Sequence, residues 1–68
     1  MIELSRTQIE ALIDEWILNE KYREIMRRRL IDGITYERLA EEFDMSVSQI
    51  KRIVYKSEDK IFRHVPLG

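Results

Sequence analysis

The stretch TYERLAEEFDMSVSQIKRIVYK, residues 35–56, decides the fold of this chain. Its first half carries apolar side chains at the i, i+3, i+4 and i+7 spacing of one helix face, namely Tyr36, Leu39, Ala40 and Phe43. Its second half has a similar stripe, made of Val47, Ile50, Ile53 and Val54. Two such stripes a few residues apart predict two short helices joined by a tight turn, which is the layout of a helix-turn-helix.

Signals for a helix start precede both halves of this stretch. Thr35 has a hydroxyl that can accept a hydrogen bond from an unsatisfied backbone N–H, and Glu37 adds negative charge to the first helical turn. Ser46 is followed three residues later by Gln49, which is the spacing of a reciprocal capping box. The sequence therefore predicts helix starts at Thr35 and Ser46.

The outward face of the second helix is polar and basic, and it consists of Ser48, Gln49, Lys51, Arg52, Tyr55 and Lys56. The residues expected to contact DNA bases are Ser48, Gln49 and Arg52, because Gln pairs bidentately with adenine and Arg with guanine. Those expected to contact the DNA backbone are Ser46, Lys51, Tyr55 and Lys56. The alternative is an ordinary solvated helix face, and Tyr55 has the further alternative of closing the edge of the core.

Together with residues 23–33, REIMRRRLIDG, this stretch resembles the fourth region of bacterial sigma factors and the small phage and regulator proteins that share its fold. The shared pattern is a helix ending in an acidic residue and Gly, a hydroxyl-capped helix with LAEE, a turn, and SVSQIKR. The resemblance covers residues 23–63 and implies transcription regulation by major-groove binding. It also implies that Arg29 contacts the DNA backbone. One departure is Asp44, at a turn position that is commonly Gly, although Asp tolerates a left-handed backbone better than most residues.

Two supporting helices are predicted over residues 7–31. The first is expected from about Thr7 to Leu18, because Thr7 and Glu10 have capping-box spacing, with Ser5 and Gln8 as the alternative box. Asn19 is the predicted terminator of this helix.

The second supporting helix is expected from about residue 20 to residue 31, ended by Asp32 and Gly33. The side chains that it is expected to bury are Tyr22, Ile25, Met26 and Leu30. The last helix is expected to continue to Phe62, because Val54 and Ile61 lie on one face, and residues 64–68 are predicted to be a frayed tail.

The apolar run Trp16, Ile17 and Leu18 covers most of the circumference of the first helix end. Trp16 is expected in the core, which leaves Ile17 or Leu18 outward. The run is therefore a candidate surface for a homodimer or for a protein partner, with an ordinary exposed apolar residue as the alternative.

The charge of the chain is close to balanced, with a formal net value of -1. Residues 1–22 carry two basic and five acidic side chains, whereas residues 45–68 carry five basic and two acidic ones. The positive end coincides with the predicted recognition helix, so the charge distribution is compatible with local phosphate binding.

Composition argues against an enzyme. The chain has no Cys, a single histidine at His64 and two glycines, so it offers neither a thiolate metal site nor a phosphate-cradling loop. Adjacent acids on a helix point apart and do not form an acid–base pair. We expect no catalytic residue, no metal and no cofactor. The longest apolar run is too short to span a membrane, and a cytoplasmic protein is expected.

These observations predict a single all-α domain over residues 1–68, a small bundle of about four helices with a helix-turn-helix at 35–57. The predicted function is a sequence-specific regulator of transcription that binds double-stranded DNA. The alternative is an interaction module that binds RNA polymerase or a sigma factor and has little DNA affinity of its own.

Overall fold

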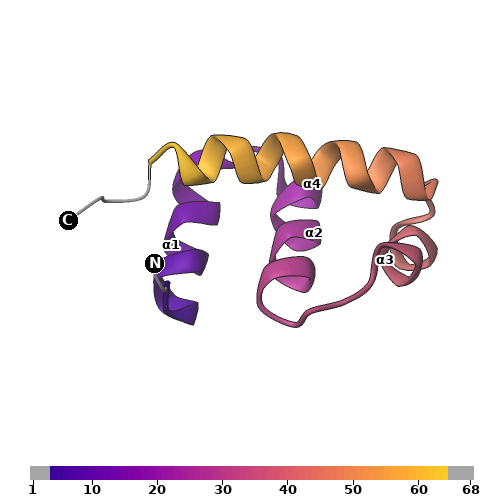
Figure 1. The fold of residues 1–68 in the computed structure, drawn as a ribbon, viewed down its shortest axis with the longest axis horizontal. Helices are drawn as coiled ribbons and strands as arrows, with labels where there is room; N and C mark the ends of the chain where they lie inside the picture. Colours follow the sequence, from indigo (N-terminus) through magenta and orange to yellow (C-terminus); the bar gives the residue numbers. More distant parts are fainter. Residues whose placement is uncertain (1–3, 65–68) are drawn as a thin grey trace.

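Helix α4, Val47–Phe62, runs along one side of the molecule, and the other three helices pack against it (Figure 1). Helices α1, Arg6–Trp16, and α2, Glu20–Leu30, contact each other beside its C-terminal and central parts, and α3, Tyr36–Phe43, lies at its N-terminal end. The structure, a computed structural model, describes residues 4–64, and these residues contain helices and no strand. This architecture confirms the predicted all-α bundle with a helix-turn-helix, formed by α3 and α4.

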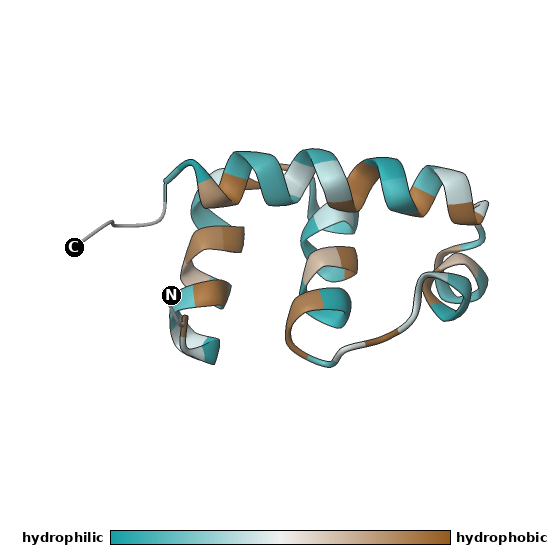
Figure 2. Cartoon of the chain, in the orientation of Figure 1, coloured by the Kyte–Doolittle hydropathy of each residue, from teal (hydrophilic) through white to brown (hydrophobic). Residues whose placement is uncertain are grey.

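Apolar side chains from all four helices meet in one core. The fully buried members are Ile13, Ile25, Met26, Leu39, Ile50, Val54 and Ile61. Hydrophilic and hydrophobic residues both recur along each helix in Figure 2, as expected for helices that bury one face. Leu39 and Ile50 anchor the predicted inward stripes of α3 and α4, and burial of Ile61 together with Val54 keeps α4 helical to Phe62.

The start of α1 follows the alternative capping box. Ser5 Oγ accepts a hydrogen bond from the Gln8 backbone N–H at 3.2 Å, and Gln8 Oε1 accepts one from the Ser5 N–H at 2.8 Å. The expected cap at Thr7 is wrong, because both halves of the box close at Ser5 and Thr7 lies inside the first helical turn.

The end of α1 also differs from the prediction. The helix ends at Trp16, and Ile17 takes an extended conformation. The guanidinium of Arg23 donates to the backbone oxygens of Ile17 and Asp14, and so satisfies carbonyls that the end of the helix leaves without partners. Asn19 does not end α1; its side chain accepts the Tyr22 N–H at 3.2 Å and caps α2.

Helix α2 buries Ile25 and Met26 as predicted, while Leu30 is partly buried. The prediction that Tyr22 is buried is wrong, since Tyr22 is 37 % exposed in the first turn of α2. After α2 the chain turns at Gly33, whose φ of +67° lies in the region that favours glycine. The turn between α3 and α4 uses Asp44 in the left-handed conformation, with φ 53° and ψ 51°, as the sequence predicted.

The domain boundaries given above stay predictions. Of the expected frayed tail, residues 65–68 lie outside the described residues, and His64 is exposed, with its ring stacked on Trp16 at 3.5 Å between centroids.

Candidate nucleic-acid interface

The start of α4 is fixed by the predicted capping box. Ser46 Oγ accepts the Gln49 backbone N–H at 3.1 Å, and Gln49 Oε1 accepts the Ser46 N–H at 2.9 Å. Two otherwise unsatisfied N–H groups are thereby paired, which holds the first turn of α4 in one conformation. Gln49 therefore has a structural role that competes with base reading, because a bidentate contact to adenine needs the same Oε1 atom.

The residues predicted to contact DNA from α4 and its cap are all exposed, namely Ser46, Ser48, Gln49, Lys51, Arg52, Tyr55 and Lys56. Their contact with DNA stays a prediction, but the geometry that it requires is present. Tyr55 is 55 % exposed, and its ring also contacts Tyr36 at the edge of the core, so its position is compatible with both alternatives.

The four arginines of α2 are engaged within the protein. Arg23 binds backbone carbonyls, Arg27 pairs with Asp14 and Glu24, Arg28 pairs with Asp32 and Glu42, and Arg29 donates to the Ile34 carbonyl at 2.9 Å. By contrast, no ion pair within residues 4–64 involves Lys51, Arg52, Lys56 or Lys60. The exposed cations of α4 therefore have no carboxylate partner among residues 4–64, and of the basic side chains of α2 the same holds for the exposed Lys21.

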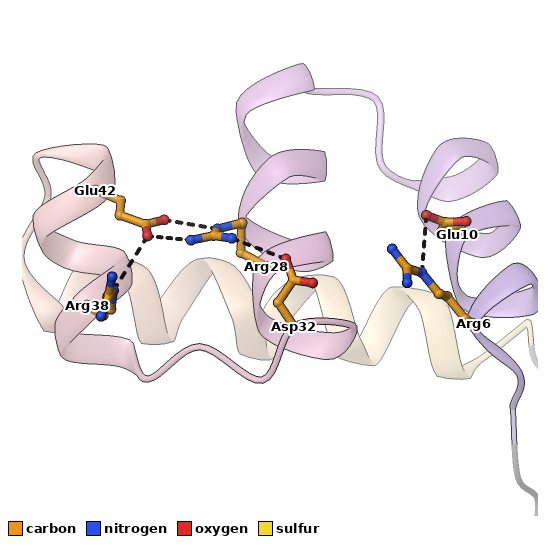
Figure 3. Close-up of polar contacts among 6 residues, drawn as sticks. All are labelled: Arg6, Glu10, Arg28, Asp32, Arg38 and Glu42. Carbon is orange, nitrogen blue, oxygen red and sulfur yellow. Dashed lines mark hydrogen bonds and ion pairs between the residues drawn. The ribbon is translucent and has the colours of Figure 1, made fainter.

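One of the α2 arginines ties the bundle to the helix-turn-helix (Figure 3). Arg28 donates from Nε to Glu42 on α3 at 3.1 Å and reaches Asp32 with another nitrogen at 3.2 Å. Arg38 approaches the same Glu42 carboxylate at 3.8 Å. The hydrogen bonds from Arg28 lower the pKa of Glu42, and the same pairing raises the pKa of Arg28. This network links α2 to α3 beside the contact that the two helices make through the core.

A cluster that the sequence did not reveal joins α2, α3 and α4 around Tyr36. The Arg29 guanidinium carbon lies 4.2 Å from the centroid of the Tyr36 ring, and Lys51 Nζ lies 5.7 Å from it. The Tyr55 ring meets the Tyr36 ring edge to face, with centroids 6.2 Å apart. Sequence spacing assigned Tyr36 to the buried stripe alone, and only the packing of the three helices brings these side chains together.

The apolar run at the end of α1 divides into three environments. Ile17 is 4 % exposed and belongs mainly to the core, because the backbone after α1 is extended there, and only a small part of it lines the groove described below. Trp16 is partly buried and Leu18 is 78 % exposed. Of the predicted surface, Leu18 is exposed and Trp16 is exposed in part.

Leu18 and Tyr22 border a shallow groove of about 360 Å³ beside α4. Ile17 and Ile53 contribute apolar surface to this groove, and its basic side chains are Arg52, Lys56 and Lys60. The groove shares Arg52 and Lys56 with the predicted DNA-binding face. A partner in the groove and DNA would therefore compete for these two side chains.

Other kinds of site are not found in the described part of the chain. Residues 4–64 contain no group of three or more His, Cys, Asp or Glu side chains arranged to hold a metal ion. No helix among them has the length and apolar character that crossing a membrane requires.

Comparison with known proteins agrees with this geometry. Residues 17–61 match the family described as Sigma-70, region 4. The match begins at the loop after α1 and ends near the C-terminus of α4, so it contains α2 and the entire helix-turn-helix. Neither the curated proteins nor the solved structures gave a significant match.

Proposed function

Because this chain belongs to the sigma-70 region 4 family of DNA-binding helix-turn-helix domains, we propose that it is a sequence-specific regulator of transcription that places the N-terminal half of α4 in the major groove. In this proposal Arg52 and Ser48 contact base edges. Gln49 also contacts a base once the hydrogen bond from the Ser46 N–H to its Oε1 has opened. Ser46, Lys51, Tyr55 and Lys56 contact the backbone.

The observation that carries the proposal is the division of the cations between helices. The α2 arginines are used in ion pairs and carbonyl hydrogen bonds, whereas Lys51, Arg52 and Lys56 are exposed on one helix without a carboxylate partner in residues 4–64. Phosphate contacts supply the sequence-independent part of DNA affinity, and cations that already have an internal carboxylate contribute less to it.

A single recognition helix with a few phosphate contacts binds DNA weakly, so the proposal includes a homodimer on a palindromic site. We further propose that the protein has no enzymatic activity and that it acts in the cytoplasm of a bacterial cell, in a chromosomal or a phage setting. The alternative function, a module that binds RNA polymerase or a sigma factor, is favoured by Leu18, which is 78 % exposed beside the apolar groove.

An NMR titration of the isotope-labelled protein with a mixed-sequence duplex, at low and at higher salt, tests the proposal. We expect salt-sensitive amide shifts confined to residues 46–56 and to the surroundings of Arg29. Shifts that are absent at low salt, where electrostatic binding is strongest, would overturn the DNA-binding function. Titration with RNA polymerase would then be expected to shift the signals of Leu18 and Tyr22 instead.

Substitutions of single cations distinguish direct DNA contacts from the effect of the total charge of the protein. Arg52→Met is expected to lower affinity by about 1–3 kcal/mol and to reduce sequence discrimination, and Lys56→Met is expected to reduce the salt slope by about 1 for all sequences. Arg63→Met is the matched control, because Arg63 is also an exposed cation but pairs with Asp59 at 2.8 Å near the end of α4. A loss for Arg63→Met as large as that for Arg52→Met would show that only the total charge matters.

A further inference from the structure

Two cations from different helices share one aromatic ring at the junction of α2, α3 and α4. Arg29 and Lys51 lie 4.2 and 5.7 Å from the centroid of Tyr36, both within the range of a cation–π interaction. Tyr36 is the first residue of α3, directly after the Thr35 cap, so its position is fixed by the start of the helix.

The two cations gather positive charge at a place where no carboxylate of residues 4–64 forms an ion pair with Arg29 or Lys51. Since like charges repel one another, bringing the two cations together costs free energy. The electron-rich face of Tyr36 offsets part of this repulsion. An anion bound between the two cations would offset the rest.

Arg29 is held in place for such a role. One of its terminal nitrogens donates to the Ile34 carbonyl at 2.9 Å, and the ring of Tyr36 lies against the guanidinium. A guanidinium has five N–H donors, so donors remain for another acceptor. Lys51 is exposed and lies next to Arg52 on α4, which puts the cluster beside the predicted base-reading residue.

We propose that Arg29, Tyr36 and Lys51 form one binding site for a phosphate of the DNA backbone, in which Tyr36 is a positioning residue that holds both cations. The inference rests on the proposed function and deepens it. A phosphate held from α2 and α4 together would fix the register of α4 in the major groove, since backbone contacts orient a DNA-binding protein on the duplex.

Salt-dependent DNA binding of three variants tests the proposal. Tyr36→Leu removes the ring and keeps apolar bulk, Tyr36→Phe keeps the ring, and Phe62→Leu is the matched control, because it removes an exposed ring at the far end of α4. We expect Tyr36→Leu to reduce the slope of log affinity against log salt by about 1, the value for one phosphate contact, and the other two variants to keep the wild-type slope.

The possible results separate this inference from the function on which it rests. Wild-type protein that does not bind DNA overturns the proposed function. Wild-type protein that binds, together with a folded Tyr36→Leu variant that keeps the full slope, overturns only the role of Tyr36. Circular dichroism and urea unfolding establish whether each variant is folded.

A second measurement needs no substitution and covers the case in which Tyr36→Leu does not fold. NMR signals of the Arg29 Nε–H, the Lys51 side chain and the Tyr36 ring are followed while duplex DNA is added to wild-type protein. We expect all three to shift together, and an Arg29 signal that stays unchanged while Lys51 shifts would overturn the shared site. Inorganic phosphate in place of DNA is expected to leave them unchanged, and saturable shifts would identify a site for a free anion instead.

Discussion

Replacing the side-chain amide of Gln49 by a carboxylate separates the structural role of this residue from its proposed role in DNA binding. In Gln49→Glu a carboxylate oxygen replaces Oε1, which accepts the Ser46 N–H at 2.9 Å, so the capping box is retained. The new negative charge lies at the N-terminus of α4, where the helix dipole favours it, but it also faces the predicted position of the DNA. Stability and DNA affinity are therefore expected to change in opposite directions.

The magnitudes follow from these contacts. A carboxylate in the first turn of a helix contributes about 0.3–1 kcal/mol, so the free energy of unfolding is expected to rise by that amount. Loss of the amide donor removes a base contact of about 1–3 kcal/mol, which corresponds to a decrease in affinity of about 5-fold to 150-fold. Urea unfolding measures the first quantity, and fluorescence anisotropy with a labelled duplex measures the second.

The chain contains a matched control for this exchange. Gln8 closes a capping box of the same kind with Ser5 at the start of α1, away from the predicted interface, so Gln8→Glu is expected to raise stability similarly and to leave affinity unchanged. Wild-type affinity of Gln49→Glu would refute the placement of Gln49 against DNA. A decrease in stability of both variants would refute the argument from the helix dipole.

Three further predictions concern the support of the helix-turn-helix. Leu39→Ala is expected to lower the free energy of unfolding by about 2–5 kcal/mol, measured by urea denaturation, because Leu39 is fully buried between α3 and the rest of the core. Asp44→Gly is expected to raise the thermal midpoint and Asp44→Val to lower it, because only the latter puts a β-branched residue at φ 53°. Wild-type protein is expected to lose stability as the pH falls below the ordinary Glu42 pKa of 4.5, because pairing with Arg28 lowers this pKa and the stabilisation requires the charged carboxylate. The free energy of unfolding of Glu42→Gln is expected to fall less than that of the wild-type protein over the same pH range. The same pH dependence for both proteins would show that the Arg28–Glu42 pair does not stabilise the fold.

Local signals in the sequence were sufficient for most of the helical structure. The predicted caps at Thr35 and Ser46 each satisfy a nearby N–H, whereas Asn19, predicted to end the first helix, caps the start of α2. Apolar spacing identified the buried faces of α3 and α4 because those helices pack on one side only. Asp44 was correctly placed in a left-handed turn, since few other residues between the two stripes tolerate that backbone.

The end of α1 was not predictable, because it depends on a residue in the next helix. Arg23 supplies donors to the Ile17 and Asp14 carbonyls, and this contact exists only once α1 and α2 are packed together. Periodicity could not decide which of three consecutive apolar residues enters the core. The structure buries Ile17, stacks Trp16 on His64 and leaves Leu18 exposed.

The part of the candidate interface that lies on one helix was predictable from the sequence, and the part that joins several helices was not. The exposed face of α4 follows from the position of its inward stripe, so the residues expected to contact DNA were identified from one helix alone. The Tyr36 cluster draws on three helices, and only the packing of these helices brings its members together. The spacing between Ser46 and Gln49 predicts that Gln49 closes a capping box. This bond must open before the Gln49 side chain can make a bidentate contact to a base.

Net charge is a poor guide to this interface, because it adds cations that have different uses. The chain carries a formal charge of -1, a value that by itself argues against binding a polyanion. Four acidic side chains, however, pair with Arg27 and Arg28, and the pairs with Asp14 and Glu42 link α2 to α1 and α3. Cations on α4 remain exposed on the face that reaches DNA in a helix-turn-helix. Such a protein should bind non-specific DNA weakly and lose that binding at modest salt, so its selectivity would depend on base contacts more than in a strongly basic binder.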